Sequence, residues 1–395
     1  MKSDGISVYL VAGEPSGDQL GGKLIDAIRC TTSSPVAFEG VGGEVMEQKG
    51  CKSLFPLSDV SVIGPIAILS RLPKLVRRVY QTVDAVIAAN PDVLVIIDSP
   101  EFTHPIAKRV RKRNPDIPII NYVSPSVWFW RSGRSRKMRS YVDHVLALLP
   151  FEPAVHKRLG GPRCTYVGHP LIERSDWIKG LKPQQLAKEL GLKRGRKILT
   201  VLPGSRHTEV TLLMEPFGGT LKRIIGEIGD VEVIVPVVSL VRHLVEEGLK
   251  SWPVKPHLVE GDAAKYQAFR LSDAALAASG TVTLELALCG TPMVVAYRLE
   301  MITSLAVKLV TFSSIVLPNL VLEKNVFPEF IDKDCTPEKL AAAMLPLLKG
   351  GRERDRQMSA LKGLEKKMHL PRGQPSDQAA KIVLEIGRAS CRERV

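Results

Sequence analysis

The stretch ISVYLVAGEPSGD, residues 6–18, decides the fold because it joins a buried strand to a turn and a helix. Its first part, Ile6–Ala12, is short and apolar throughout, which is typical of a parallel strand covered on both faces. A small-residue turn follows, and a helix is predicted from about Gln19. Such a turn lets the backbone approach a ligand closely, and the helix start offers N–H groups to an anion. The candidate ligand contacts are Glu14, Ser16, Gly17 and Asp18.

One observation and one alternative limit this interpretation of the first turn as a ligand site. The dinucleotide fingerprint GxGxxG is absent from it. A plain strand–helix turn, capped by Ser16 or Asp18, remains open as the alternative.

The same strand-then-helix unit recurs along the chain, which predicts parallel sheets covered by helices. In the first half the predicted strands are Ile6–Ala12, Val36–Val41, Val93–Asp98, Ile117–Val123, Val145–Leu149 and Thr165–Val167. In the second half they are Ile198–Leu202, Val231–Val235, His257–Val259, Ala274–Ala278 and Met293–Ala296. The sequence therefore predicts an α/β fold with two doubly wound, Rossmann-like domains.

The length of 395 residues also favours two domains. A polar stretch at Gly168–Lys182 predicts the boundary, with an amino-terminal domain over 1–170 and a carboxyl-terminal domain over 171–370. A helix over 371–386 is expected to pack back on the amino-terminal domain. Its pattern stops at Gly387, and the tail 387–395 is left out of the fold prediction as a candidate for non-native sequence.

Ligands of open α/β sheets bind beyond the carboxyl ends of the strands. Two such domains facing each other would leave a cleft between those ends. A motif that directly follows a predicted strand is therefore a candidate for ligand contact.

Composition and charge narrow the function classes. A formal charge of +14 favours an anionic partner, either nucleic acid, anionic lipid or a phosphorylated substrate. No apolar run reaches the roughly 18–20 residues of a membrane-spanning helix, and Met1–Gly13 lacks the features of a signal peptide. We therefore expect a cytoplasmic protein. Its six scattered cysteines, with no CxxC pair, favour reduced thiols over disulfides or a zinc site.

The predicted strand Val93–Asp98 ends in Asp98-Ser99-Pro100-Glu101. Proline suits the first position of a helix, so Ser99 is the natural N-cap and Asp98 is not needed for capping. A carboxylate freed from capping at a strand end is a candidate general base. A structural aspartate that bonds loop amides is the alternative.

Two turns of the second half predict a diphosphate site. After Ile198–Leu202, Gly204 permits close approach, Ser205 supplies a hydroxyl and Arg206 can bind phosphate through two hydrogen bonds. After Ala274–Ala278, the amides of Ser279, Gly280 and Thr281 could hold a phosphate. Glu285 lies on the helix face of Thr281, outside capping-box spacing, and is expected to be available to ribose hydroxyls. Ordinary capped turns are the alternative for both segments.

Seven motifs in register resemble the lipid-A-disaccharide synthase family over about residues 6–386. They are Gly13-Glu14-Pro15-Ser16-Gly17-Asp18, Tyr122-Val123-Ser124-Pro125-Ser126-Val127-Trp128, Leu148-Leu149-Pro150-Phe151-Glu152, Val167-Gly168-His169-Pro170, Leu202-Pro203-Gly204-Ser205-Arg206, Ser279–Glu285 and Leu317-Pro318-Asn319.

This resemblance implies a GT-B type hexosyltransferase of lipid A (lipopolysaccharide) biosynthesis that needs no metal and no cofactor. The donor would be UDP-2,3-diacylglucosamine and the acceptor 2,3-diacylglucosamine 1-phosphate (lipid X). Transfer to the acceptor 6-hydroxyl, with inversion, would give lipid A disaccharide 1-phosphate and UDP. The amino-terminal domain would bind the acceptor, and the carboxyl-terminal domain the UDP-sugar.

The resemblance also implies roles for individual residues. Asp98 is expected to activate the acceptor hydroxyl, and Arg206 to offset charge on the departing diphosphate. The residues implied for UDP are Gly204, Ser205, Arg206, Ser279, Gly280, Thr281, Thr283, Glu285 and Asn319; those implied for the acceptor or the cleft are Glu14, Ser16, Gly17, Asp18, His169 and Tyr297. One departure follows Asn319, where Glu323 replaces the expected pattern and leaves the loop's contacts open.

Leu69–Ile87 is a predicted basic amphipathic helix. Its apolar stripe is Leu69, Leu72, Val76, Val79, Val83 and Val86, and its cations are Arg71, Lys74, Arg77 and Arg78. Such a helix can lie in an anionic bilayer surface, which predicts peripheral association with the inner membrane. A core-facing helix with a solvated basic face is the alternative. Trp128-Phe129-Trp130 is likewise either an interfacial anchor or a core cluster.

Three other functions stay open at this stage. A UDP-sugar epimerase would share the fold but act on a soluble sugar. A non-catalytic nucleotide-sugar sensor would keep only the UDP site. A nucleic-acid-binding protein would explain the charge, but no known binding module is present, so no nucleic-acid partner is expected. The oligomeric state is left open, a homodimer included.

Overall fold

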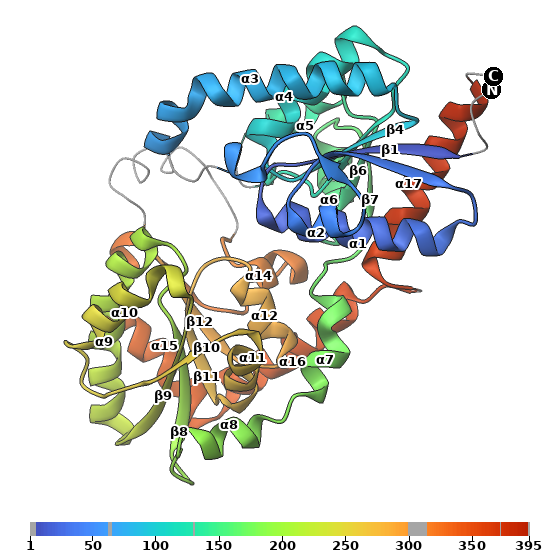
Figure 1. The fold of residues 1–395 in the computed structure, drawn as a ribbon. Coiled ribbons are helices and arrows are strands. Elements are labelled where there is room, and N and C mark those ends of the chain that lie inside the picture. The colour runs from blue at the N-terminus through green and yellow to red at the C-terminus, as the bar shows by residue number, and fades with distance from the viewer. Residues whose placement is uncertain (1–4, 62–64, 129–130, 299–313, 372, 394–395) are drawn as a thin grey trace. The chain divides into compact units, whose positions relative to one another are not determined.

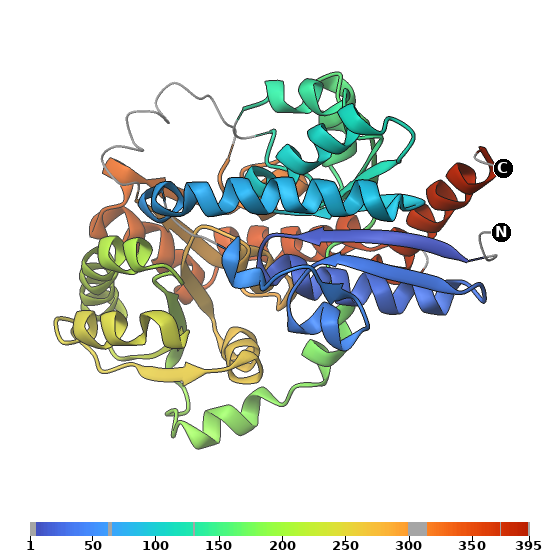
Figure 2. The ribbon, with the colours of Figure 1, turned by 45° about the horizontal axis from the view of Figure 1, so that its top comes forward.

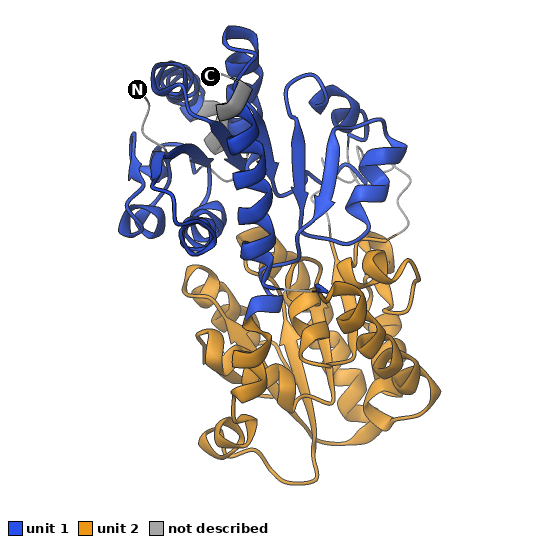
Figure 3. Ribbon diagram, turned by 90° about the vertical axis from the view of Figure 1, so that its right-hand side faces the viewer, with its two compact units in different colours: residues 1–173, 370–395 blue, residues 174–369 orange. Residues whose placement is uncertain are grey.

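The computed structural model describes residues 5–61, 65–128, 131–298, 314–371 and 373–393, with side chains at 65–70 and 391–393 left out. The chain divides into two compact units, which Figure 3 colours separately. Unit 1 comprises Met1–Glu173 and Leu370–Val395, and unit 2 comprises Arg174–His369. The chain thus passes from unit 1 to unit 2 after Glu173, three residues beyond the expected boundary at 170 and inside the polar stretch Gly168–Lys182.

Unit 1 contains a parallel sheet of seven strands in the order β3-β2-β1-β4-β5-β6-β7. The strands are β1 (Ile6–Ala12), β2 (Val36–Val41), β3 (Lys52–Ser53), β4 (Val93–Ile97), β5 (Ile119–Tyr122), β6 (His144–Ala147) and β7 (Arg163–Tyr166). From β1 the order runs outward to β2 and β3 on one side and through β4 to β7 on the other. The carboxyl ends of β1 and β4 therefore flank a topological switch point, where ligands of such sheets bind.

Two helix pairs cover the faces of this sheet (Figures 1 and 2). Val8, Leu10 and Ala12 of β1 pack with α1 (Pro15–Thr31) and α17 (Pro375–Glu393) in one apolar cluster. Tyr9 and Val11 of the same strand pack with α3 (Pro65–Ala89) and α4 (Pro100–Arg113) in another. Burial on both faces explains why β1 and β4 are apolar at every position but one.

The last helix corrects the prediction that the pattern stops at Gly387. Helix α17 continues through that residue to Glu393. This residue faces the starts of β1 and β4, because a Cβ built on it would lie 3.5 Å from both Ile6 and Val93, an ordinary contact distance. Glycine inside a helix costs about 1 kcal/mol relative to alanine, and packing of this kind offsets that cost. Ser390, beyond the glycine, is buried.

Unit 2 contains a second parallel sheet, of six strands in the order β10-β9-β8-β11-β12-β13. The strands are β8 (Lys197–Leu202), β9 (Val231–Val237), β10 (His257–Glu260), β11 (Ala274–Ala278), β12 (Met293–Tyr297) and β13 (Glu329–Ile331). Helices α9 (His207–Ile228), α10 (Arg242–Leu249) and α15 (Pro337–Lys349) share one apolar cluster with this sheet. Helices α8 (Pro183–Glu189) and α11 (Asp262–Leu271) share another. Here β8 and β11 flank the switch point.

Shorter elements complete the described chain. The helices are α2 (Glu44–Gln48), α5 (Gly133–Met138), α6 (Glu152–Arg158), α7 (Ser175–Gly180), α12 (Val282–Leu288), α14 (Leu317–Leu322) and α16 (Arg352–Met368). Single 3-10 turns lie at Leu57–Asp59, Ile172–Arg174, Ser239–Val241 and Asp332–Asp334.

The predicted α/β class with two doubly wound sheets is confirmed, and every predicted strand is present. The sequence prediction missed β3 and β13, which are short strands at the sheet edges. It also placed the first helix too late, because α1 begins at Pro15 rather than near Gln19. Proline at the first helical position is favourable there.

Replacing Leu384 by alanine is expected to destabilise unit 1 by about 2–5 kcal/mol, since its side chain is 3% exposed in the cluster between α17, α1 and the sheet. Chemical denaturation measures this change. Lys381→Ala, on the exposed side of the same helix, is the control and should change stability by less than about 0.5 kcal/mol. Equal effects of the two substitutions would contradict the packing of α17 on unit 1.

Candidate functional site

Asp98 directly follows β4 at the switch point of unit 1 and is half-buried. It and Ser99 both adopt the left-handed backbone conformation, with φ of 53° and 43°. Burial, and to a lesser degree the negative charge of Glu14, raise the pKa of Asp98 above its usual value, against a hydrogen bond from the Ser99 amide. Backbone strain and a raised pKa at a strand end are both typical of functional sites.

The structure corrects the predicted cap of α4. Ser99 occupies the N-cap position, but its hydroxyl is buried without a hydrogen-bond partner among the described residues. Thr103 instead donates its hydroxyl to the carbonyl of Asp98 at 2.7 Å. The Asp98 carboxylate is not needed for the cap, as expected.

The first turn lies beside Asp98 because glycine occupies its start. A Cβ on Gly13 would lie 2.6 Å from the Cβ of Ser99, so no larger residue fits. Gly17 is buried, and its Cβ would lie 3.3 Å from the carbonyl oxygen of Ile97. Glu14 is half-buried and Ser16 is exposed, and neither side chain caps α1. Glu14 is thus the member of this turn that acts electrostatically on Asp98.

Asp18, a predicted ligand contact, has a structural role in this turn. Its buried carboxylate accepts hydrogen bonds from the amides of Gly43, Val45 and Met46 at 2.8–3.1 Å. The carboxylate therefore caps α2 and ties it to α1. The alternative of an Asp18 cap on its own helix, α1, does not hold, because the carboxylate caps α2.

The two glycine turns of unit 2 line one cavity of about 650 Å³ at the carboxyl ends of β8, β9, β10 and β11. Gly204, Ser205 and Arg206 contribute one wall, and Ser279, Gly280 and Thr281 another. Because β8 and β11 are adjacent and parallel, the turns that follow them meet at the same edge. Gly204 and Gly280, with φ of 126° and 145°, hold backbone conformations that other residues rarely adopt.

Glu285 also lines this cavity, and part of the hydrogen-bonding capacity of its carboxylate is used by the protein itself. It accepts hydrogen bonds from Lys265 Nζ and from the Tyr266 hydroxyl, both at 3.1 Å. Tyr266 is fully buried, so this carboxylate is held in one place. Sequence reasoning missed both partners, which lie on α11. The signal that could have found them is the position of α11 directly after β10, at the same sheet edge.

Arg206 reaches the cavity as an exposed side chain, and Glu209 shapes the turn that carries it. One Glu209 oxygen accepts from the amides of Ser205 and Arg206, at 3.0 and 3.3 Å. The other lies 3.2 Å from the Arg206 guanidinium. These amides are therefore occupied by a carboxylate. An anion in the cavity would have to bind the guanidinium and the remaining groups.

Three predicted UDP contacts are engaged elsewhere. The Ser279 hydroxyl donates to the Ile315 carbonyl at 2.9 Å, and its amide belongs to the sheet ladder. Thr283 is fully buried and donates to the Gly280 carbonyl at 2.8 Å. Asn319 is buried, accepts from the amides of Val326 and Phe327, and donates to the Phe327 carbonyl. Thr283 and Asn319 do not line the cavity; they fix the turn and loop around it.

The remaining residues singled out from the sequence are His169, Tyr297 and Glu323, which lie in a loop, at a strand end and at a helix end. His169 accepts from the Leu171 amide at 3.2 Å, and burial lowers its pKa to about 4. Tyr297 ends β12 and is half-buried. Glu323 ends α14 in the left-handed conformation with φ of 56°, and its carboxylate lies 3.8 Å from Lys367. The altered loop thus makes a surface ion pair.

The apolar stripe predicted on α3 is buried in one part and exposed in another. Val79, Val83 and Val86 pack in the core of unit 1, whereas Leu72 and Val76 are 44% and 45% exposed. Tyr80, half exposed, continues the outer part. Leu69 and the apolar segment 62–68 lie outside the described side chains. Among the side chains of α3 that the structure describes, the core-facing alternative therefore holds for Val79, Val83 and Val86 and does not hold for Leu72 and Val76.

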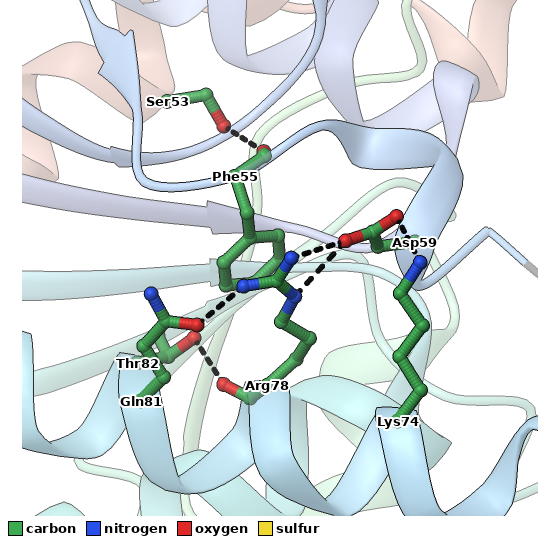
Figure 4. Close-up of polar contacts among 7 residues, drawn as sticks. All are labelled: Ser53, Phe55, Asp59, Lys74, Arg78, Gln81 and Thr82. Carbon is green, nitrogen blue, oxygen red and sulfur yellow. Dashed lines mark hydrogen bonds and ion pairs between the residues drawn. The ribbon is translucent and has the colours of Figure 1, made fainter.

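Two of the predicted cations on α3 serve the fold (Figure 4). Asp59 accepts from Lys74 Nζ at 2.6 Å and from Arg78 Nη2 at 2.5 Å. Arg78 also stacks over the Phe55 ring at 4.5 Å. Hydrogen bonds from Lys74 and Arg78 lower the pKa of Asp59. Arg71 and Arg77 stay exposed beside Leu72 and Val76.

The aromatic segment favours the core alternative where it is described. Trp128 packs edge-on against Phe151, with ring centroids 5.2 Å apart. This contact joins the motif at 122–128 to the motif at 148–152. Phe129 and Trp130 lie outside the described residues. None of the helices in the described part of the chain has the length and apolarity to cross a bilayer.

Comparisons with known proteins agree with this geometry. Structures with the same fold include the UDP-GlcNAc 2-epimerase of Neisseria meningitidis, with a TM-score of 0.63, 12% identity, and coverage of 96% of this chain and 99% of that one. A glycosyltransferase of Rickettsia africae aligns with a TM-score of 0.58 at 10% identity, covering 99% of each chain. These likenesses establish the fold alone, which is of the GT-B type.

Sequence relatives define the family. The profile described as Lipid-A-disaccharide synthetase matches residues 8–383. The lipid-A-disaccharide synthase of Rhodopseudomonas palustris strain HaA2 is 48% identical over 96% of both chains. That of Nitrobacter winogradskyi is 49% identical, over 97% of this chain and 96% of its own length. This chain belongs to the lipid-A-disaccharide synthase family, and the epimerase alternative is not favoured.

Proposed function

We propose that this protein transfers 2,3-diacylglucosamine from UDP-2,3-diacylglucosamine to the 6-hydroxyl of 2,3-diacylglucosamine 1-phosphate (lipid X). The products are lipid A disaccharide 1-phosphate and UDP. The bond from the acceptor O6 to the donor anomeric carbon forms as the bond from that carbon to the diphosphate breaks, with inversion. The observation that carries the proposal is Asp98, a half-buried carboxylate with a raised pKa at the switch point of unit 1.

Asp98 is proposed to accept the proton of the acceptor hydroxyl. A carboxylate with a raised pKa is a stronger base than an ordinary one. Asp98 directly follows β4 on a backbone held in the left-handed region, and the next residue, Ser99, lies against Gly13 of the first turn. Glu14 acts through its charge, which keeps Asp98 basic.

The donor is proposed to bind in the cavity of unit 2. Its diphosphate would meet the Arg206 guanidinium, which is 67% exposed and can leave Glu209 at little cost. Glu285, held by Lys265 and Tyr266, would accept from the ribose hydroxyls. Arg206 would then offset the charge that develops as UDP departs. We propose that the two units bring the acceptor and the donor together for reaction.

Peripheral association with the inner membrane, from the cytoplasm, is proposed for the exposed part of α3. Both substrates carry acyl chains, which must rest on apolar surface or stay in the bilayer. Leu72, Val76 and Tyr80 offer such a surface, with Arg71 and Arg77 placed for anionic head groups.

Asp98→Asn is expected to lower turnover by about 10²–10⁴-fold while leaving UDP affinity nearly unchanged. Mass spectrometry of products from UDP-2,3-diacylglucosamine and lipid X measures turnover, and calorimetry measures UDP binding. Asp116→Asn, on an exposed loop of unit 1, is the control and should behave as wild type. Absence of disaccharide phosphate from the wild-type reaction would refute the proposed function. Full activity of Asp98→Asn would refute the role of the base.

The raised pKa of Asp98 also predicts the pH dependence of kcat. The rate is full while Asp98 is ionised and falls as the pH drops through its pKa, so the acid limb should lie above that of an ordinary aspartate. Glu14→Gln removes one raising charge and should move this limb to lower pH. A limb that does not move would show that Glu14 does not tune the base.

Tyr266→Phe should raise the KM for the UDP-sugar by about tenfold, because Glu285 loses one of its two fixed hydrogen bonds. The substitution removes only the hydroxyl from a buried ring, so the fold should persist. Gln267→Ala, one residue along and outside the cavity lining, is the control. Steady-state kinetics with varied donor decides, and an unchanged KM would contradict the role of Glu285.

Leu72→Glu combined with Val76→Glu should abolish sedimentation with anionic vesicles, because two charges would enter the exposed apolar stripe. Thermal stability should change little, since both side chains are exposed. Ala88→Glu, exposed near the other end of α3, controls for added negative charge. Retained vesicle binding by the double variant would place the membrane contact elsewhere.

A further inference from the structure

Helices α4 and α5 of unit 1 border a cationic cavity that the proposed reaction has not used. Its volume is about 460 Å³, and its charged lining consists of Lys108, Arg131, Arg134 and Lys137 with the single carboxylate of Glu101. A second hollow of about 490 Å³ shares Lys108 and Lys137 with it. The two basic runs of the sequence, 108–113 and 131–139, thus meet at one place.

The inner wall of this cavity is neutral, so its charge lies at the rim. Asn121 Nδ2 donates to the Val123 carbonyl at 2.8 Å, which turns its amide oxygen toward His104 Nε2 at 3.2 Å. His104 is therefore protonated on Nε2, and its Nδ1 accepts from the Tyr141 hydroxyl at 3.0 Å. Burial lowers the pKa of His104 to about 4, which agrees with this neutral tautomer.

The Glu101 carboxylate pairs with the arginines at this rim, where a bound anion would also pair. Its carboxylate lies 2.7 Å from Arg134 and 3.9 Å from Arg131. The Glu101 side chain is 71% exposed, whereas that of Arg134 is 20% exposed. The carboxylate can therefore swing into solvent while the guanidinium stays, and losing an exposed ion pair costs little. A phosphate, with more charge and three oxygens, is a better partner for two guanidinium groups.

The cavity is close to Asp98 along the chain. Pro100 and Glu101, which line it, are two and three residues after Asp98. An extended chain spans at most about 3.3–3.6 Å per residue, so the backbone of Pro100 and Glu101 lies within roughly 7–11 Å of the backbone of Asp98. In a hexose 1-phosphate, one sugar ring separates the 6-hydroxyl from the phosphate. The apolar rings of Pro100 and Pro105 in the lining suit the ring of that sugar.

We propose that this cavity binds the anomeric phosphate of the acceptor sugar, with Arg134 as its main cation and Glu101 as the carboxylate that the phosphate displaces. The proposal rests on the proposed function for the identity of the acceptor. It explains why the excess positive charge gathers beside the base. Single-stranded nucleic acid is a poorer fit, because Tyr141, 4% exposed, offers no face for base stacking.

The test compares three variants with lipid X and with 2,3-diacylglucosamine that lacks the phosphate, both dispersed in neutral detergent. Arg134→Gln and Lys137→Gln, both in the cavity lining, should raise the KM for lipid X, by about tenfold for Arg134, and leave the KM for the donor unchanged. Neither should affect the acceptor that lacks the phosphate. Arg136→Gln, on the same helix but outside the lining, is the matched control.

Glu101→Gln gives a result of opposite sign. It removes the competing carboxylate, so the KM for lipid X should fall severalfold, an effect that a merely structural ion pair would not produce. Equal effects of Arg134→Gln on both acceptors would overturn the proposal. So would loss of binding to anionic vesicles with an unchanged KM, since that would assign these cations to membrane head groups.

Calorimetry with glucosamine 1-phosphate at millimolar concentration separates the failure of this proposal from the failure of the proposed function, because binding needs no turnover. If the wild-type protein forms no disaccharide yet binds glucosamine 1-phosphate, and Arg134→Gln abolishes that binding, the phosphate site stands while the reaction does not. If disaccharide forms and all variants bind and react as wild type, the phosphate site falls while the reaction stands. Absence of both disaccharide and glucosamine 1-phosphate binding would overturn both.

Discussion

Burial of the central strands on both faces is the constraint on which the rest of this molecule depends. In unit 1, β1 and β4 pack against α1 and α17 on one side and against α3 and α4 on the other. Polar side chains are therefore rare along these two strands and gather beyond the strand ends. Gly13, Glu14 and Asp98 therefore gather where the strand order reverses. In unit 2 the same constraint gathers the turns at Gly204 and Gly280 around one cavity.

The carboxylates of this protein have different roles, which depend on the groups that donate hydrogen bonds to them. Asp18 accepts three amides and Glu209 two, and both fix a helix start. Glu152 accepts the Leu149 amide within the core, where burial raises its pKa to about 8. Glu285 is held by a lysine and a tyrosine at the cavity wall. Asp98 differs because, within the described part of the chain, its carboxylate neither caps a helix nor pairs with a cation, which leaves it suited to accept a proton.

The positive charge of the chain is also divided by structure. Lys74 and Arg78 neutralise Asp59 and join α3 to the preceding turn. Lys108, Arg131, Arg134 and Lys137 face one cavity with a single carboxylate. Arg71 and Arg77 remain at the surface beside exposed apolar side chains. A net charge alone could not have distinguished these three uses, because it carries no information on which charges meet.

The amino-acid sequence by itself determined the α/β class, the two sheets, every long strand, the strand-end position of Asp98 and the two glycine turns, because these depend on local apolar runs and on residues adjacent in the chain. The sequence did not predict contacts between residues that lie far apart along the chain. Asp18 caps α2, Lys265 and Tyr266 hold Glu285, Asn319 is buried under its own loop, and α17 continues past Gly387 because β1 and β4 lie against it. Only the tertiary structure decided these, since a hydrogen bond or a packing contact depends on distances in space that residue types and their spacing do not specify.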